Sequence, residues 1–357
     1  MQSIAVVFKI GLLGVVVSCA ASCAERSTGP GGQETLGIKV GGAATGPVRW
    51  SADGKEIYYV HSANLAGGSD SIEAIRLADG MVRGLAVDTA DLGTYLELSN
   101  DGGRLYYTSQ QRATGLLTLR RIDVDGRRDT SVADSLGMGS AVLSPAGRFV
   151  AYYRQDGAAL VLNDSSGASV VIGSGSPLAF SPDGLQLLYL GMCAGGAGQF
   201  CVVPISGGGA TVLADTFSLD NEGYSKLARW APTGVQQLAV LNGYPSAVYV
   251  TNVSMATTTK VWSAGSNPEW ILSVAWSLDG ARVAVATTGC NPLEGTCPAN
   301  PNRLYVVDVA SGRSTTIAVT ARGLLGVAFS PDGSRIAYAV TGTSTPFSGP
   351  IYYQALQ

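Results

Sequence analysis

The side chains that could carry chemistry are few, and their types limit the reactions open to this chain. His61 is the one histidine among 357 residues, so a zinc site of the usual His-rich kind cannot be built. A Ser–His–Asp triad would have to use His61, and the sequence contains no Gly-x-Ser-x-Gly motif. We therefore predict a surface His61 at the end of a strand, with no catalytic residues, no cofactor and no metal ligands.

Acidic residues gather once outside any regular pattern, at Asp215 and then at Asp220, Asn221 and Glu222, with Tyr224 close behind. Oxygen ligands of this kind suit Ca²⁺, but their spacing matches no calcium loop, and a solvated loop is the favoured interpretation. A pair of carboxylates brought together from distant parts of the chain would instead suit glycoside hydrolysis, and the sequence leaves this alternative open.

The charge balance restricts the class of partner. The formal net charge is −3, and the basic residues form no cluster larger than two neighbouring arginines. A nucleic-acid-binding protein needs a basic footprint, which this chain lacks. A polybasic membrane patch is absent as well.

The first two dozen residues have the features of an export signal. Residues 10–24 carry no charge, and this run is shorter than the roughly 20 apolar residues needed to span a bilayer. Residues 16–19, Val-Val-Ser-Cys, resemble the bacterial lipobox, which favours Cys19 as the lipidated residue and leaves Cys23 as the alternative. We expect a lipoprotein signal peptide and lipidation site over 1–23 and a flexible tether over 24–33.

One short motif recurs seven times: an aromatic residue or Leu, then Ser or Ala, two variable residues, Gly, and an apolar strand. The copies are residues 50–54, 98–102, 143–147, 180–184, 230–234, 276–280 and 329–333. Their spacing lies close to the roughly 40–50 residues of one propeller blade. Five of the copies place Asp before Gly, which predicts a tight turn in which the carboxylate bonds its own backbone and Gly takes positive φ.

The segments after each turn alternate as strands do. The third and fifth residues after Gly are nearly all apolar or Tyr, for example Ile57 and Tyr59. Residues 34–40 predict a strand with no blade before it, and residues 351–355 predict one with no strand after it. We therefore expect residues 34–357 to form an all-β, seven-bladed β-propeller that is closed by N- and C-terminal strands sharing the last blade.

The best preserved copy, Phe-Ser-Pro-Asp-Gly followed by Arg-Ile-Ala-Tyr over residues 329–338, resembles the TolB-like and WD-repeat-like propellers of bacteria. The resemblance covers about residues 34–357. It implies a bacterial envelope protein in which the propeller is a binding module. The chain departs from TolB itself in its lipobox, its count of seven repeats, and its lack of an α/β domain before the ring.

Four further cysteines fall into two local pairs, which an exported protein is free to oxidise. Cys193 and Cys201 lie between the second and third strands of blade 4, and Cys290 and Cys297 occupy the same place in blade 6. Blades 4 and 6 are not neighbours, so a bond between the pairs would exceed the roughly 7 Å limit between Cα atoms. We expect two local disulfides, Cys193–Cys201 and Cys290–Cys297.

The uneven loop lengths suggest which face of the ring binds a partner. The tight turns share one face, and the longer connections, among them residues 191–199, 216–226 and 288–302, share the other. We expect a non-catalytic binding or scaffolding protein, periplasmic or at the cell outer membrane, which meets a protein or glycan through Asp220, Asn221, Glu222 and Tyr224. The expected chain is a monomer that touches the membrane only through its lipid. A glycan hydrolase or lyase with carboxylates in the central funnel is the alternative.

Overall fold

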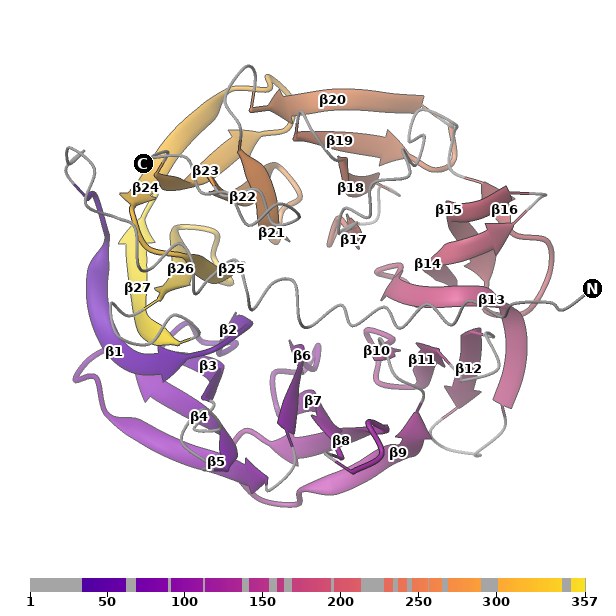
Figure 1. Cartoon of the computed structure of the whole chain (residues 1–357), viewed down its shortest axis with the longest axis horizontal. Coiled ribbons are helices and arrows are strands. Elements are labelled where there is room, and N and C mark those ends of the chain that lie inside the picture. Colours follow the sequence, from indigo (N-terminus) through magenta and orange to yellow (C-terminus); the bar gives the residue numbers. More distant parts are fainter. Residues whose placement is uncertain are drawn as a thin grey trace, which may run out of the picture.

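The repeated strands fold into a ring, as a computed structural model shows (Figure 1). The structure describes residues 34–356 apart from 62–68, 89–90, 112, 137–140, 154–158, 164–168, 194–195, 213–227, 234–236, 243–245, 256, 265–268, 290–300 and 342–347. Within that part of the chain every strand pair is antiparallel, and the sheets stand around one axis like the blades of a propeller. The all-β propeller expected from the sequence is thereby confirmed.

Five of the sheets found among the described residues have four strands each. In each of these sheets the strands are given from the innermost to the outermost. The first two sheets are β2 (Val48–Trp50), β3 (Glu56–His61), β4 (Asp70–Arg76) and β5 (Val82–Asp88), and then β6 (Asp91–Leu98), β7 (Arg104–Gln110), β8 (Leu117–Asp123) and β9 (Thr130–Leu136). The other three are β17 (Ala228–Trp230), β18 (Gln237–Asn242), β19 (Ala247–Asn252) and β20 (Thr257–Ser263); β21 (Trp270–Trp276), β22 (Arg282–Thr288), β23 (Asn302–Asp308) and β24 (Ser314–Thr320); and β25 (Leu324–Phe329), β26 (Arg335–Val340), β27 (Gly349–Ala355) and β1 (Ile38–Ala44).

A sheet of seven strands occupies the remaining sector of the ring. Its strands are β10 (Ala141–Leu143), β11 (Phe149–Tyr153), β12 (Ala159–Asn163), β13 (Ser169–Phe180), β14 (Gln186–Cys193), β15 (Gly196–Pro204) and β16 (Thr211–Val212). The long strand β13 joins the two halves of this sheet. Its first residues, up to Gly173, pair with β12, and its later residues, from Ser174, pair with β14.

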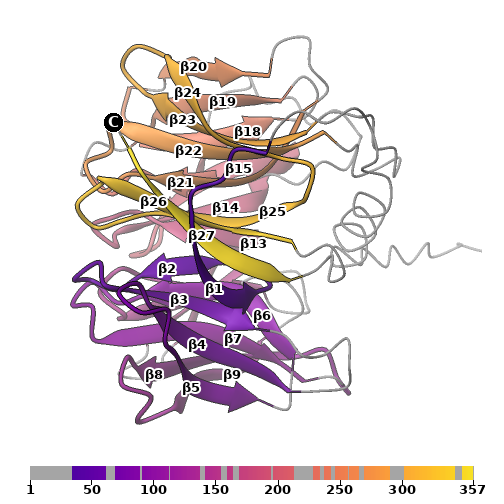
Figure 2. The ribbon, with the colours of Figure 1, turned by 90° about the vertical axis from the view of Figure 1, so that its left-hand side faces the viewer.

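The two ends of the described chain meet in one sheet, as expected. β1 is the outermost strand of the last sheet and runs antiparallel to β27, with Ile38 opposite Tyr353 and Ala44 opposite Gly349 (Figure 2). The strand begins at Ile38 rather than at residue 34, because Thr35 instead bridges to Val319 on β24 of the neighbouring sheet. The N-terminal segment therefore ties two sheets together.

The motif turns form as the sequence predicts. In the first copy the Gly54 amide donates to the Ser51 carbonyl at 2.9 Å, and Gly54 has φ +68°. The Asp53 carboxylate accepts from the Lys55 amide at 3.1 Å and from the Ser51 hydroxyl at 2.7 Å. The same backbone bonds are made by the aspartates at 101, 183, 279 and 332. These aspartates are turn residues, as expected.

The core lies between neighbouring sheets rather than at the axis. Tyr59 and Ile57 of β3 are fully buried and pack with Ala337 and Ile351 of the last sheet, and similar clusters fill the other junctions. Burying a side chain of this size contributes roughly 1.5–3 kcal/mol, so each junction is a substantial part of the stability of the ring.

Tryptophans at the head of the motif bind the inner strands to one another. The Trp50 indole donates to the carbonyl of Ala328 at 3.0 Å, and those of Trp230 and Trp276 donate to Ala179 and Arg229 at 3.2 Å. Each accepting carbonyl belongs to the residue just before the motif of the preceding repeat. Each of these tryptophans therefore stabilises the ring in two ways: its side chain packs in the junction between sheets, and its N–H hydrogen-bonds the adjacent inner strand.

Candidate functional site

Most of the site residues predicted from the sequence lie outside the described residues. Asp220, Asn221, Glu222 and Tyr224 fall in 213–227, Cys290 and Cys297 in 290–300, and Cys19 and Cys23 in 1–33. These assignments therefore stay predictions.

Cys193 and Cys201 form a disulfide, which joins the end of β14 to β15. The expectation of a long irregular connection over 191–199 was wrong. β14 continues to Cys193 and β15 begins at Gly196, because the two strands keep pairing, with Leu190 opposite Phe200 and Gly191 opposite Gln199. The disulfide therefore cross-links the two paired strands of the β14–β15 hairpin and does not fix the shape of a long loop.

His61 is partly exposed at the end of β3, and it has a partner that sequence reasoning missed. Its Nδ1 lies 3.1 Å from Glu73 Oε1, and the other carboxylate oxygen accepts from the Tyr59 hydroxyl at 2.5 Å. Burial acts to raise the pKa of Glu73, but the bonds from Tyr59, His61 and Ser71 outweigh it and lower the pKa. The Glu73 carboxylate thus serves as an acceptor for buried polar groups.

Glu269 is a fully buried acid next to β21. Its carboxylate is paired with the Arg303 guanidinium, accepts from the Thr287 hydroxyl at 2.9 Å, and lies 3.1 and 3.2 Å from the Tyr305 hydroxyl. A buried charge survives only when it is paired and hydrogen-bonded, and Glu269 meets both conditions. This cluster joins the first and third strands of its sheet and has the character of a structural network.

Three charged residues belong to inner strands that stand around the axis (Figure 1), and we call them the axial cluster: Arg49 on β2, Glu97 on β6 and Arg229 on β17. Each stands one residue before the aromatic or Leu of its motif. The equivalent positions in the other copies carry small or apolar residues, namely Val142, Ala179, Ala275 and Ala328. The cluster was visible in the sequence as the charged exceptions in this column.

Arg49 and Glu97 of the axial cluster form a two-point ion pair. Arg49 Nη2 donates to Glu97 Oε1 at 2.6 Å, and Arg49 Nε donates to Oε2 at 2.9 Å. Burial acts to raise the pKa of Glu97, but the Arg49 guanidinium outweighs it and holds the pKa below its usual value. Both side chains still reach solvent, with 23% and 40% of their surface exposed.

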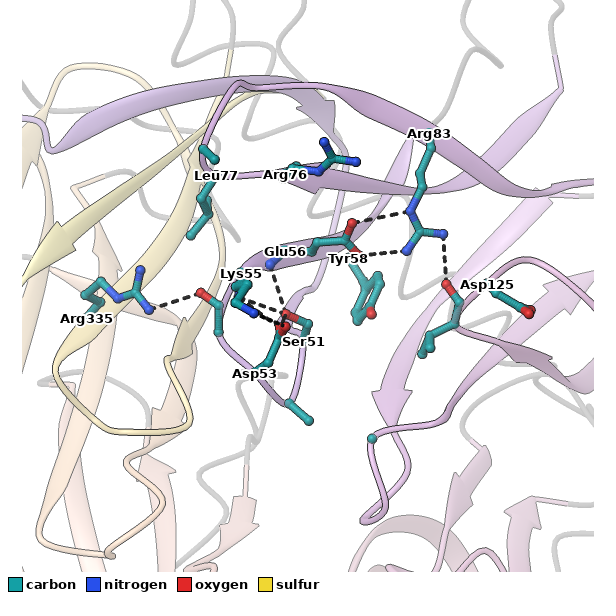
Figure 3. Close-up of a pocket in the computed structure, with 15 residues that line it drawn as sticks. Ser51, Asp53, Lys55, Glu56, Tyr58, Arg76, Leu77, Arg83, Asp125 and Arg335 are labelled. Carbon is teal, nitrogen blue, oxygen red and sulfur yellow. Dashed lines mark hydrogen bonds and ion pairs between the residues drawn. The ribbon is translucent and has the colours of Figure 1, made fainter.

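A pocket of about 790 Å³ lies among the tight turns (Figure 3). We call it the turn-face pocket. It is lined by the motif turn at 51–56, by the outer turn at 76–78, by Gly102 and residues 124–125 of the next sheet, and by Arg335 of the last sheet. Its size lies within the range of small-ligand sites.

The charged residues of the turn-face pocket are held by protein partners. Arg83 makes a two-point pair with Glu56, at 2.6 and 3.4 Å, and also donates to the Val124 carbonyl at 2.8 Å (Figure 3). Arg335 donates to the Gly54 carbonyl at 3.0 Å and lies over the Trp50 ring, 4.8 Å from its centre. Burial, with help from Glu56, raises the pKa of Tyr58 to about 12, so its hydroxyl stays protonated. The pocket is thus lined by charged side chains whose positions are fixed by protein partners.

Neither region has the groups of a metal centre. Among the residues that the structure describes, no three His, Cys, Asp or Glu side chains are close enough to share an ion. No helix in the same part of the chain is long and apolar enough to cross a membrane.

Solved structures share the ring. An oligogalacturonate lyase in complex with manganese superposes with a TM-score of 0.67 and 14% identity, over 91% of this chain and 96% of that chain. The β-propeller domain of Cps50 (Swd1) from Myceliophteria thermophila gives 0.60 and 15%, over 91% and 99%. TolB from Acinetobacter baumannii gives 0.49 and 17%, over 86% and 78%. At such identities the first two likenesses show a β-propeller fold and nothing finer, and the third, with a TM-score below 0.5, carries no argument.

The sequence matches no protein-family model and no curated protein. The class of protein that the fold and the likeness to solved structures define is the β-propeller.

Proposed function

We propose that this chain is a non-catalytic binding or scaffolding protein of the cell envelope, anchored by an N-terminal lipid, whose propeller presents a loop face to a protein or glycan partner. The observation that supports this most is how the carboxylates near the axis and the turn-face pocket are used. Glu97 and Glu56 each make a two-point pair with an arginine. These acids hold other side chains in place, which suits a rigid recognition surface.

The alternative, a hydrolase or lyase with funnel carboxylates, needs a carboxyl group that holds a proton near neutral pH. The pairing with Arg49 lowers the pKa of Glu97 and so opposes that role. Turnover of a glycan by the wild type that Glu97→Gln abolishes would favour the enzyme over the binding protein.

We further propose that the ring has seven blades. The seven-stranded sheet is then two blades that share β13, whose first half is the outer strand of one blade and whose second half is the inner strand of the next. Seven motif copies in the sequence support this count.

The partner is proposed to dock on the face of the longer connections, over the sector that carries Cys193–Cys201, residues 220–224 and the cysteines at 290 and 297. Replacing residues 216–226 with a short Gly/Ser linker, or Cys290 and Cys297 with Ser, is expected to leave the fold intact and to abolish binding. Partners captured from envelope extract are to be purified and titrated against both variants by surface plasmon resonance.

Lys55→Ala, on the turn face, is the matched control and is expected to bind like the wild type. If both loop variants bind normally and the turn-face change alone weakens binding, the proposed face is wrong.

The lipid anchor has its own test. Cells fed a radioactive fatty acid are expected to label the wild-type chain, because the lipobox thiol becomes the acylation site. The Cys19→Ala, Cys23→Ala double variant is expected to carry no label and to leave the membrane fraction. Label that survives in the double variant would exclude lipidation at these positions.

A further inference from the structure

Charge in the axial cluster is unbalanced. Two guanidinium groups, those of Arg49 and Arg229, lie within electrostatic range of one carboxylate, that of Glu97. Their strands β2, β17 and β6 stand around the axis of the ring (Figure 1). Glu97 is already bound at two points by Arg49. The equivalent positions on the other inner strands are Val or Ala, so none of those residues supplies a second anion.

Arg229 is the cation of the axial cluster that has no carboxylate partner among the described residues. Its side chain is exposed, and Nη1 donates to the carbonyl of Ala228, its own neighbour on β17, at 3.1 Å. Within the described residues no carboxylate lies at ion-pair distance from it, whereas Arg49 has one at 2.6 Å. A guanidinium carries five N–H donors, and the bond to Ala228 uses one of them.

The surroundings make this cation stronger than a surface arginine. Although the side chain still reaches solvent, desolvation by the surrounding protein is the largest influence and lowers the pKa of Arg229. Attraction to Glu97 acts to raise that pKa, and repulsion from Arg49 lowers it further. The group stays charged, but it does so in protein surroundings that screen its field less than bulk water would. An anion placed beside it would relieve the repulsion between the two arginines.

We propose that the axial cluster is an oxyanion-binding site, in which Arg229 is the main contact and Arg49, oriented by Glu97, is the second. The ligand group is a carboxylate or a phosphate, because the planar fork of arginine matches two oxygens of either one. The site goes beyond the loop-face partner proposed above and does not depend on it.

Isothermal titration calorimetry of the purified full chain with inorganic phosphate and, separately, with acetate tests the site. The wild type is expected to bind at least one of them saturably, and the preferred anion tells phosphate from carboxylate. Arg229→Ala is expected to weaken that binding about tenfold or more, since a charged hydrogen bond of this kind is lost. The Trp276 indole bonds the Arg229 backbone carbonyl, so the variant keeps that fold contact.

Arg127→Ala, which removes a largely exposed arginine from an outer turn, is the control for net charge and is expected to bind like the wild type. Nitrogen NMR signals of the arginine side chains provide a check that needs no variant, because those of Arg229 and Arg49 are expected to shift on titration. Absence of saturable binding by either anion, or equal losses in the two variants, would overturn the proposal. Either result leaves the loop-face proposal standing, since that proposal is tested with its own variants.

Discussion

Replacing Arg303 with Met is expected to lower the free energy of unfolding by about 3 kcal/mol. The change leaves the Glu269 carboxylate, which is fully buried, without its counter-charge. Breaking a buried ion pair from one side costs roughly 3–5 kcal/mol, and the lower end applies here because Thr287 and Tyr305 still bond the acid. Equilibrium unfolding in guanidinium chloride measures the loss as a shift of the midpoint at an unchanged slope.

Arg313→Met, at an exposed arginine beside a turn of the same sheet, is the matched control and is expected to change stability by less than about 0.5 kcal/mol. Adding Glu269→Leu to the Arg303→Met variant is expected to recover much of the loss, because no unpaired charge remains. A wild-type midpoint in the single variant would mean that Arg303 does not compensate Glu269.

Replacing Trp50 with Ala is expected to cost about 3–5 kcal/mol, the usual range for removing a buried tryptophan. Trp50 lies at the closure of the ring and is 4% exposed. It packs under Arg335, meets Tyr353 edge-on at 6.4 Å between ring centres, and bonds Ala328 of the last sheet. The cavity therefore opens where the first and last sheets meet, and calorimetric melting of the chain reports it as a lower Tm.

Trp50→Phe keeps most of the ring but loses the indole N–H, so a smaller cost of about 1 kcal/mol is expected. Leu278→Ala is the matched control, since it removes an exposed side chain from an equivalent turn of another sheet. If Trp50→Ala melts no lower than this control, the closure does not depend on Trp50.

The motif turns and the strand columns were predictable because their physics is local. A Ser-x-Asp-Gly turn binds its own backbone, and the alternate apolar residues after it, such as Ile57 and Tyr59, can face only a buried junction. The union of first and last strands was predictable as well, since pairing with each other satisfies the backbone groups that both would otherwise leave exposed at an edge.

What escaped prediction depends on contacts between distant residues. No local pattern tells that the Tyr59 hydroxyl reaches Glu73, or that β14 and β15 keep pairing through residues 191–199. The axial cluster was within reach of the sequence, because Arg49, Glu97 and Arg229 stand in one column of otherwise small residues. The expected loop-face residues belong to no repeat, so nothing in the sequence specifies their position beyond which face they share.

The attachment of the first described residues has a mechanical consequence. Glu34 pairs with Arg322 at 3.1 Å and accepts from Thr320, and Thr35 bridges to Val319, all before the chain enters β1. A force that pulls on the chain ahead of Glu34 therefore acts first on the contacts with the sheet that contains β24. Only after these contacts break does it act on the hydrogen bonds between β1 and β27 in the last sheet. The contacts of Glu34 and Thr35 must break before the load reaches β1, so the outermost strand is shielded from being peeled away one hydrogen bond at a time.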